Sequence, residues 1–310
     1  MSQSLVFCGT PRFAVPTLEA LVHAGFPVRL VVTQPDKPRG RGLVLTPSPV
    51  KQTALALNLP VTQPTSIKNN HEFRSQLESI KPDAIIVVGY GRIIPQWMID
   101  LPRHGNINLH ASLLPKYRGA APIQWAIARG ETMTGVTTMR IDAGLDTGDI
   151  LLQKDIPIAA TDTAETLAPA LAAVGADLLV ETLHGLQAGG IEARPQDDAQ
   201  ASLAPILKKE DGRIDFRLSA REIRDRLRGF QPWPGVFTSF RGKNLHLWDA
   251  ALSEHSLVPG ELLAEGDRLF IGCGEGALEI LEVQVEGKKR MPARDFIHGY
   301  RPQAGEKLGS

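Results

Sequence analysis

The chain has 310 residues, of which 43% are hydrophobic and 22% charged, a balance that is typical of globular proteins and excludes a disordered or fibrous one. Its 34 basic and 34 acidic side chains cancel, which argues against a general nucleic-acid coat but is compatible with a local basic patch. Cys8 and Cys273 are far apart and lack metal-type spacing, so no disulfide framework is expected. The apolar runs are too short to cross a bilayer and no secretory signal is evident, so we expect a cytoplasmic protein.

The N-terminal stretch predicts a strand at residues 4–8 and a second strand at 28–33, joined by a helix. Thr10 is placed to cap that helix, with Pro11 at its first position, where the missing N–H does no harm. A strand, a helix and a strand of these lengths indicate a parallel sheet with right-handed crossovers. The intervening turn lacks the spacing G-x-G-x-x-G, so the fold is indicated without a dinucleotide.

Residues 34–43, QPDKPRGRGL, contain prolines and glycines that exclude a regular element, so we expect an exposed loop. Lys37, Arg39 and Arg41 place a small positive cluster on this loop, and its glycines would let the backbone approach a phosphate. One interpretation is a loop that contacts RNA. The other is a solvated loop with incidental charge, and the residues alone leave both open.

The next elements extend the same pattern of alternating helices and strands. Helices are expected at 50–57 and 71–80, with a short strand at 59–61. The unbroken apolar run Ala84–Val88 predicts a central parallel strand that is buried on both faces. It leads into Gly89-Tyr90-Gly91-Arg92-Ile93-Ile94-Pro95, where two glycines permit a tight loop against a flat ligand or a plain turn.

Residues 105–110 alternate between polar and apolar side chains, which is the mark of a strand. Asn106, Asn108 and His110 share one face of it, one strand repeat apart. The strand soon ends, because Pro115 removes a backbone donor and biases its predecessor toward an extended shape. A strand end followed at once by a loop is where ligands bind in open α/β sheets.

Asn108 and His110 suit one kind of chemistry. Both can donate hydrogen bonds to an oxygen that becomes negative when a carbonyl carbon is attacked, and one such donor is typically worth about 100- to 1,000-fold in rate. In the later motif Gly144–Asp149, the Asp146 carboxylate could orient the imidazole and keep it protonated, or accept a proton through water. The alternative is that Asn108 caps a turn and His110 is an ordinary polar residue at a sheet edge.

The rest of the chain predicts a second, smaller domain. A helix is expected at 120–128, strands at 135–141 and 150–158, and a long helix at 161–186 that begins with a capping box. After a Gly-, Pro- and Asp-containing linker, short strands and a helix at 219–228 predict an OB-like barrel. The expected fold is α/β: a Rossmann-like, mostly parallel sheet domain (1–188), the linker (189–204) and a small C-terminal OB-like β-barrel domain (205–310).

The string N-x-H-x-SLLP-x-x-RG at 108–119, followed by GLDTGD at 144–149, resembles the formyltransferases that use 10-formyltetrahydrofolate. The resemblance is greatest to those that act on methionyl-tRNA, and it covers almost the whole chain. It extends over Cys8–Ala14, Gln34–Asp36, Pro47–Lys51, Gly119–Gln124 and Pro232–Pro234.

This resemblance implies an enzyme that transfers a one-carbon group. The donor would be 10-formyltetrahydrofolate, and the acceptor the α-amino group of methionine on initiator tRNA, for translation initiation. Asn108 and His110 would hold the formyl oxygen, while Asp146 would support His110 and help to remove a proton from the attacking nitrogen. Ser112, Leu113, Leu114 and Pro115 match the folate-contacting motif of the family, whose members line the pterin pocket with the segment equivalent to 89–95.

The resemblance also bears on the partners. It makes RNA contact the favoured interpretation of Lys37, Arg39 and Arg41, and it implies a tRNA-binding C-terminal domain in which residues 288–290 could touch the RNA backbone. No metal is expected, because the eight histidines are scattered. We expect a monomer that binds tRNA and folate and no membrane.

Other functions remain open. Similar domain pairs formylate amino sugar nucleotides or hydrolyse 10-formyltetrahydrofolate, whereas enzymes that formylate free glycinamide ribonucleotide usually end after the first domain. A non-catalytic RNA-binding protein on the same scaffold would have no need of Asn108, His110 and Asp146 together. The basic, glycine-rich stretch 34–43 favours a tRNA acceptor over a sugar.

Overall fold

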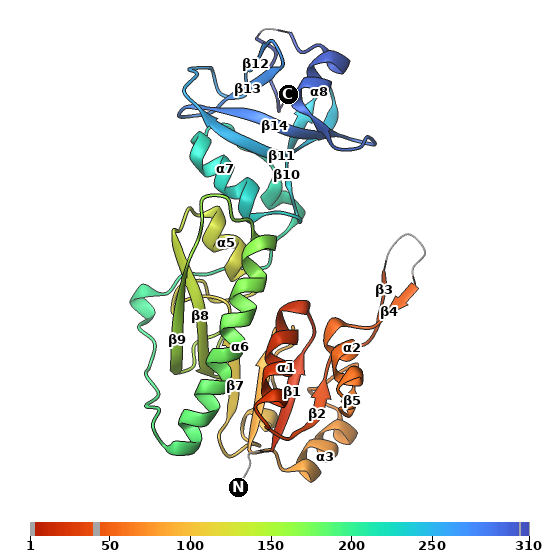
Figure 1. The fold of residues 1–310 in the computed structure, drawn as a ribbon, viewed down its shortest axis with the longest axis vertical. Helices are drawn as coiled ribbons and strands as arrows, with labels where there is room; N and C mark the ends of the chain where they lie inside the picture. The colour runs from red at the N-terminus through yellow and green to blue at the C-terminus, as the bar shows by residue number, and fades with distance from the viewer. Residues whose placement is uncertain (1–3, 40–43, 304, 310) are drawn as a thin grey trace. The chain divides into compact units, whose positions relative to one another are not determined.

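The computed structural model describes residues 4–39, 44–303 and 305–309. These form two compact units (Figure 1). Unit 1 comprises Met1–Pro122, Met133–Pro157 and Ala168–Pro205; unit 2 comprises Ile123–Thr132, Ile158–Leu167 and Ile206–Ser310. The domain boundaries expected from the sequence stay a prediction.

Unit 1 is built on a seven-stranded sheet in the order β5-β2-β1-β6-β7-β8-β9. The first five strands of this order run parallel, and β8 and β9 are antiparallel to their neighbours, which confirms the predicted mostly parallel sheet. The strands are β1 (Leu5–Gly9), β2 (Val28–Val32), β5 (Val61–Thr62), β6 (Ala84–Val88), β7 (Asn106–His110), β8 (Met133–Arg140) and β9 (Ile150–Pro157).

Helices cover both faces of this sheet, as its apolar strands require. The cluster of buried side chains on one face joins β1, β2 and β6 to Phe73 and Leu77 of α3 and to Met98 of α4. On the other face, Leu109 of β7 packs against Gly175 of α6, and Figure 1 shows α1 and α6 in front of the sheet. The helices are α1 (Val15–His23), α2 (Pro49–Ala56), α3 (His71–Ile80), α4 (Gln96–Ile99) and α6 (Ala164–Ala188).

Among the described residues, α6 alone is long and apolar enough to cross a membrane, but half of its most apolar 18-residue window is buried within the protein, as in a core helix.

Both cysteines are free and buried. Burial raises the pKa of the Cys8 thiol and that of Cys273, the latter to about 11, so neither is an effective nucleophile at neutral pH.

The structure corrects two local predictions near the N-terminus. Thr10 does not cap a helix: its hydroxyl donates to the Tyr90 carbonyl at 3.3 Å, and α1 begins only at Val15, after a 3₁₀ turn. Residues 34–43 were expected to lack regular structure, yet β3 (Lys37–Arg39) pairs with β4 (Val44–Thr46) in an antiparallel ribbon. Proline is tolerated in such a strand because one edge of a two-stranded ribbon needs no donor.

Unit 2 is dominated by an antiparallel sheet in the order β10-β11-β14-β13-β12, with β15 paired to β14. This arrangement is consistent with the predicted small barrel. Arg228 of α7 donates to the carbonyls of Ala159 and Asp162 and thereby ties residues 158–167 to this unit. The elements are α5 (Pro122–Ala128), α7 (Ala220–Gly229), β10 (Val236–Phe240), β11 (Lys243–Ser253), β12 (Leu262–Glu265), β13 (Arg268–Gly272), β14 (Ala277–Val285), β15 (Met291–Pro292) and α8 (Ala293–Tyr300).

The packing of α3 gives a stability prediction. Leu77 is fully buried, so Leu77→Ala should leave a cavity and lower the free energy of unfolding by about 2–5 kcal/mol. Gln76→Ala, at an exposed position of the same helix, should change it by less than about 0.5 kcal/mol. Chemical denaturation of the three proteins measures the difference; equal midpoints for both variants would contradict the packing described here.

Candidate active site

The candidate site lies where parallel strands end side by side. In the sheet, β1, β6 and β7 are adjacent and parallel, so their C-terminal ends meet at one edge, the edge at which α/β proteins bind ligands. His110 is the last residue of β7. The loops that leave this edge contain residues 10–14, 89–95 and 111–119.

The polar face of β7 holds three side chains with different surroundings. Asn106 donates to the carbonyls of Met98 and Ile99 at 2.8 and 3.1 Å and so fixes α4 rather than facing a ligand. Asn108 is half-buried between β6 and β8, and its carboxamide has no hydrogen-bond partner within residues 4–39, 44–303 and 305–309. His110 is only 6% exposed. The predicted alternation of the strand therefore holds, and Asn108 and His110 are the two neighbours that can serve a ligand.

One ring nitrogen of His110 is hydrogen-bonded, and the other faces a carboxylate. Its Nε2 lies 2.8 Å from the Tyr117 carbonyl oxygen. Because a carbonyl can only accept, Nε2 must carry a hydrogen, and only Nδ1 can gain or lose a proton. Nδ1 lies 3.6 Å from Asp146 Oδ2. The ring thus presents its exchangeable position to a carboxylate, as the sequence motif suggested.

Asp146 reaches His110 because its loop folds back along the sheet. The register pairs Arg140, at the end of β8, with Ile107 near the start of β7, so the loop begins at the opposite end of β7 from His110. Gly148 is required there, since a Cβ at this position would overlap the Arg140 carbonyl. Asp146 itself has a φ of 52°, a left-handed conformation that is unusual for a non-glycine residue and is often found at functional sites.

The segment that follows β7 closes around these groups. The Gly119 amide donates to Asp146 Oδ2 at 2.8 Å. Of the four residues expected to contact folate, Ser112 and Leu114 have 0% and 3% exposed surface, whereas Leu113 and Pro115 are half-buried. Their contact with folate stays a prediction.

Sequence reasoning missed the side chains that hold this segment in place. Thr137 Oγ1 donates to the Ser112 carbonyl at 2.6 Å and accepts from the Leu114 amide at 3.1 Å. Gln153 Nε2 donates to the Leu114 carbonyl at 2.8 Å. Both residues lie within the strands β8 and β9, and nothing in a local pattern distinguishes them from other strand residues.

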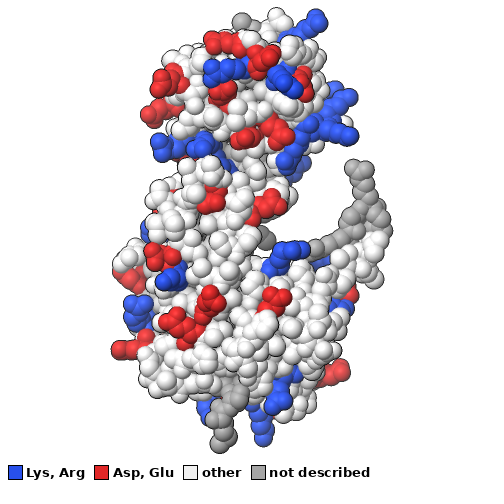
Figure 2. All heavy atoms as spheres, viewed as in Figure 1, with Lys and Arg blue, Asp and Glu red and all other residues white. Residues whose placement is uncertain are grey.

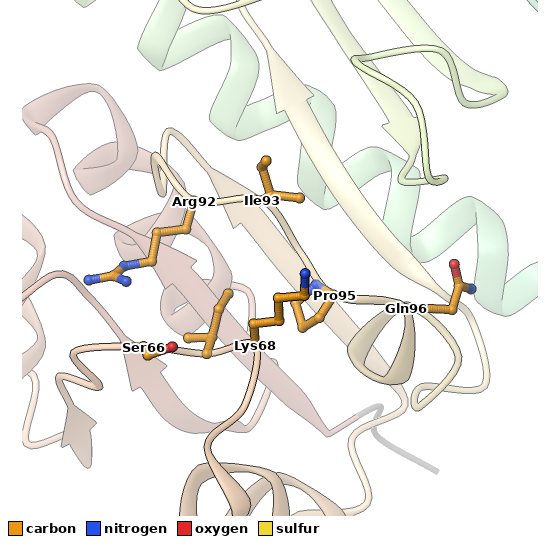
Figure 3. A pocket seen from close by; sticks show the side chains of 7 residues that line it. Ser66, Lys68, Arg92, Ile93, Pro95 and Gln96 are labelled. Carbon is orange, nitrogen blue, oxygen red and sulfur yellow. The ribbon is translucent and has the colours of Figure 1, made fainter.

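A pocket of about 400 Å³ opens at the end of β6, the neighbour of β7. Figure 3 shows Arg92 and Ile93 on the segment after β6 and Ser66 and Lys68 on the segment before α3. The Ile93 side chain is 93% exposed, which is unusual for a large apolar residue. The Arg92 guanidinium donates to the Thr65 carbonyl at 2.7 Å. The walls are Ser66, Ile67, Lys68, Arg92, Ile93, Pro95 and Gln96.

The basic stretch 34–43 is only partly described. Lys37 is exposed, the side chain of Arg39 is not described, and Arg41 lies outside the described residues. The neighbouring Asp36 is engaged: Lys51 Nζ lies 2.7 Å from its carboxylate and Gln63 donates to it at 2.7 Å. The hydrogen bonds from Lys51 and Gln63 lower the pKa of Asp36. Elsewhere on the face drawn in Figure 2, basic and acidic side chains are interspersed over both units.

Comparison with known proteins agrees with this geometry. The family model described as "Formyl transferase" matches residues 2–183, and that described as "Formyl transferase, C-terminal domain" matches residues 206–301. The methionyl-tRNA formyltransferase of Koribacter versatilis (strain Ellin345) is 70% identical over 306 residues, 98% of each chain. That of Acidobacterium capsulatum is 63% identical over 309 residues, 99% of each chain.

Among solved structures, an N-formyltransferase from Helicobacter canadensis, in complex with folinic acid and dTDP-3-aminofucose, has a TM-score of 0.68. It is 20% identical, and the match covers 94% of this chain and 100% of that one. This likeness concerns the fold, whereas the sequence matches decide the family. The chain belongs to the formyl transferase family, within the group formed by the methionyl-tRNA formyltransferases.

Proposed function

We propose that the protein transfers the formyl group of 10-formyltetrahydrofolate to the α-amino group of methionine on initiator methionyl-tRNA, for translation initiation. Full-length relatives with 63% and 70% identity carry this activity in their names. The observation that supports it most directly is the arrangement at the end of β7. There, Asn108 and His110 project from one face, and Asp146 Oδ2 lies 3.6 Å from His110 Nδ1.

The chemistry proceeds by direct attack of the methionyl amine on the formyl carbon. Negative charge then collects on the formyl oxygen, and we assign the Asn108 carboxamide and the protonated Nδ1 of His110 to donate hydrogen bonds to it. Nδ1 is the available position because Nε2 is bound to the Tyr117 carbonyl. Asp146, beside Nδ1, stabilises the charged ring and assists removal of the proton from the attacking nitrogen, directly or through water. The tetrahedral adduct then collapses: the bond between the formyl carbon and N10 of the folate breaks, the proton taken from the amine is passed to N10, and tetrahydrofolate leaves as a neutral amine.

The amine is itself the nucleophile, so no covalent enzyme intermediate is required. Holding the amine and the formyl carbon together supplies a further part of the acceleration, because effective molarities for oriented groups reach about 10⁵ M or more. The buried position of His110 supports this role, since hydrogen bonds to a developing charge are stronger where water is excluded.

The loops at the same edge of the sheet support a folate donor. A folate combines a flat pterin ring with a negatively charged glutamate. The segment 89–95 and the half-buried Leu113 and Pro115 offer surfaces for the ring and its linker. The pocket beside β6 combines the exposed Ile93 with the cations Lys68 and Arg92, a set that suits an apolar group ending in carboxylates.

The acceptor tRNA is assigned to two basic regions. Lys37, Arg39 and Arg41 form the first, and the engagement of Asp36 by Lys51 keeps that carboxylate from cancelling their charge. In the C-terminal domain, Lys288 and Lys289 are exposed, and the Arg290 guanidinium lies 3.3 Å from the centroid of the Trp248 ring. A cation on an aromatic face is a surface that RNA backbone and bases can use. We expect the enzyme to act as a monomer in the cytoplasm.

The first test identifies the acceptor. Purified protein with 10-formyltetrahydrofolate should formylate methionyl-tRNA, and it should leave uncharged tRNA and an amino sugar nucleotide unchanged, because both lack the methionyl amine. Acid-gel separation of the tRNA and chromatography of the nucleotide measure the products. Formylation of the sugar alone would replace the proposed function by the sugar-nucleotide alternative, and release of formate without either product would indicate a hydrolase.

A second test concerns the oxygen-binding pair. Asn108→Ala and His110→Ala should each lower kcat by about 100- to 1,000-fold, because each removes a donor to the developing charge. Folate affinity, measured by fluorescence titration, should change little. His23→Ala, at an exposed position at the end of α1, serves as the histidine control and should retain full activity. Near-normal kcat in either site variant would refute its assigned role.

A third test concerns the basic stretch. Arg41→Ala should raise the KM for tRNA and reduce the slope of log KM against log salt concentration by about 1, because one phosphate contact is lost. Arg103→Ala is the control. The Arg103 side chain is 78% exposed, and the residue lies just before the N-terminal end of β7. The basic stretch instead follows the C-terminal end of the parallel strand β2, so the two arginines lie at opposite ends of parallel strands. An unchanged salt slope for Arg41→Ala would remove this stretch from the RNA interface.

A further inference from the structure

Residues 191–205, here called the connecting segment, lie between the two stretches that match the family models, yet they belong to unit 1. Their backbone is tied to it at several points. Arg194 exchanges two hydrogen bonds with Ile150 at the start of β9, at 2.8 and 2.9 Å. Ser202 Oγ accepts from the Tyr117 amide at 2.9 Å, and the Ala204 amide donates to the Arg118 carbonyl at 2.7 Å. The connecting segment therefore contacts the loop that follows β7, and it pairs with the first residue of β9, where the loop that contains Asp146 ends.

Gln196 of this segment joins the two loops through one side chain. Its Oε1 accepts from Arg118 Nε and Nη2 at 3.0 and 2.8 Å. Its Nε2 donates to the carbonyls of Asp146 and Gly148 at 2.8 and 2.7 Å. A primary amide offers two acceptor positions and two N–H groups, so all four are used. Arg118 is 6% exposed and also pairs with Asp198 at 2.8 Å, which makes it a fixed anchor.

The two loops that Gln196 joins carry the groups that define the site. Arg118 lies between Tyr117, whose carbonyl binds His110 Nε2, and Gly119, whose amide binds Asp146 Oδ2. On the other loop, Gln196 binds the carbonyl of Asp146 itself. That residue has a left-handed backbone, a conformation that persists only where surrounding contacts enforce it. Gln196 supplies two of those contacts.

We propose that Gln196 is a positioning residue for formyl transfer: by clamping the Asp146 loop to the Arg118 loop, it sets the Asp146 carboxylate against His110 Nδ1. This inference rests on the proposed roles of Asp146 and His110. The connecting segment thus lies between the two stretches that match the family models and also helps to hold the active site in place.

The chemistry of the amide explains why glutamine suits this position. A carboxylate would bind Arg118 at least as well, but it has no N–H for the two carbonyls and would repel both. Gln196→Glu therefore preserves one half of the clamp and breaks the other, the half that holds Asp146. Gln196→Met removes both halves while keeping a side chain of similar length.

The experiment uses the full-length enzyme with methionyl-tRNA and 10-formyltetrahydrofolate. Gln196→Glu and Gln196→Met should lower kcat by about 10- to 100-fold, since small displacements of a catalytic group cost this much. KM for both substrates should stay within about threefold. Gln200→Glu is the matched control: it makes the same change on the same segment at an exposed position and should leave kcat and KM unchanged.

Two further measurements separate positioning from general destabilisation. If Gln196 acts through Asp146, Gln196→Glu should lower kcat little further in an Asp146→Asn background. In ¹⁵N NMR spectra, the His110 imidazole resonances should shift in Gln196→Glu and not in Gln200→Glu. Unchanged kcat in Gln196→Glu, losses that multiply with those of Asp146→Asn, or unshifted His110 resonances would each overturn the inference. An inactive wild-type enzyme whose His110 resonances still respond to Gln196→Glu would instead overturn the proposed function.

Discussion

The candidate site depends on one hydrogen bond, from His110 Nε2 to the carbonyl of Tyr117. It decides which ring nitrogen carries a fixed hydrogen, and it leaves Nδ1 as the position at which a proton can be exchanged. The same bond turns Nδ1 toward Asp146. Without it, the imidazole could rotate or adopt the other tautomer, and the carboxylate would lose its defined partner. Tyr117 can present its carbonyl in this way because its backbone is itself left-handed, with a φ of 62°.

Two loops without regular structure, the loop after β7 and the Asp146 loop, surround the hydrogen bond between His110 and Tyr117. Side chains from strands and from the connecting segment hold both loops in place. Thr137 and Gln153 satisfy backbone groups of the loop after β7, and Gln196 satisfies those of the Asp146 loop. Loop carbonyls and amides that would otherwise need water thus have protein partners. A strained residue such as Asp146 can then keep one conformation, which suits a site that must place charge accurately.

Charge is organised locally in a protein whose net charge is zero. The Asp36 carboxylate lies beside the basic stretch but is bound by Lys51 and Gln63, so it neutralises the exposed Lys37 less than its place in the sequence would suggest. This arrangement reconciles a neutral composition with a proposed RNA partner.

Local patterns in the sequence determined much of the fold. The alternation of residues 105–110 gave the two faces of β7, the apolar run Ala84–Val88 gave the central strand β6, and the helix expected at 219–228 is α7. These features depend on side-chain period and on hydrogen bonds between near neighbours, which are legible in a single sequence. The motifs also identified Asn108, His110 and Asp146 as candidates, because their chemistry suits acyl transfer.

Only the tertiary structure decided how these candidates meet. Asp146 reaches His110 through the register of β8 against β7 and the return of the loop along the sheet. No local sequence pattern specifies which residues of β8 pair with which residues of β7. The β3–β4 ribbon was not predicted, because strand pairing outweighed the turn propensity of residues 34–43. The start of α1 was placed too early, because Thr10 donates to the Tyr90 carbonyl and does not cap the helix. The connecting segment has the composition of a linker, yet two long-range hydrogen bonds bind it to the site: Gln196 donates to the Asp146 carbonyl, and Ser202 Oγ accepts from the Tyr117 amide. Such bonds depend on which residues the fold brings together in space.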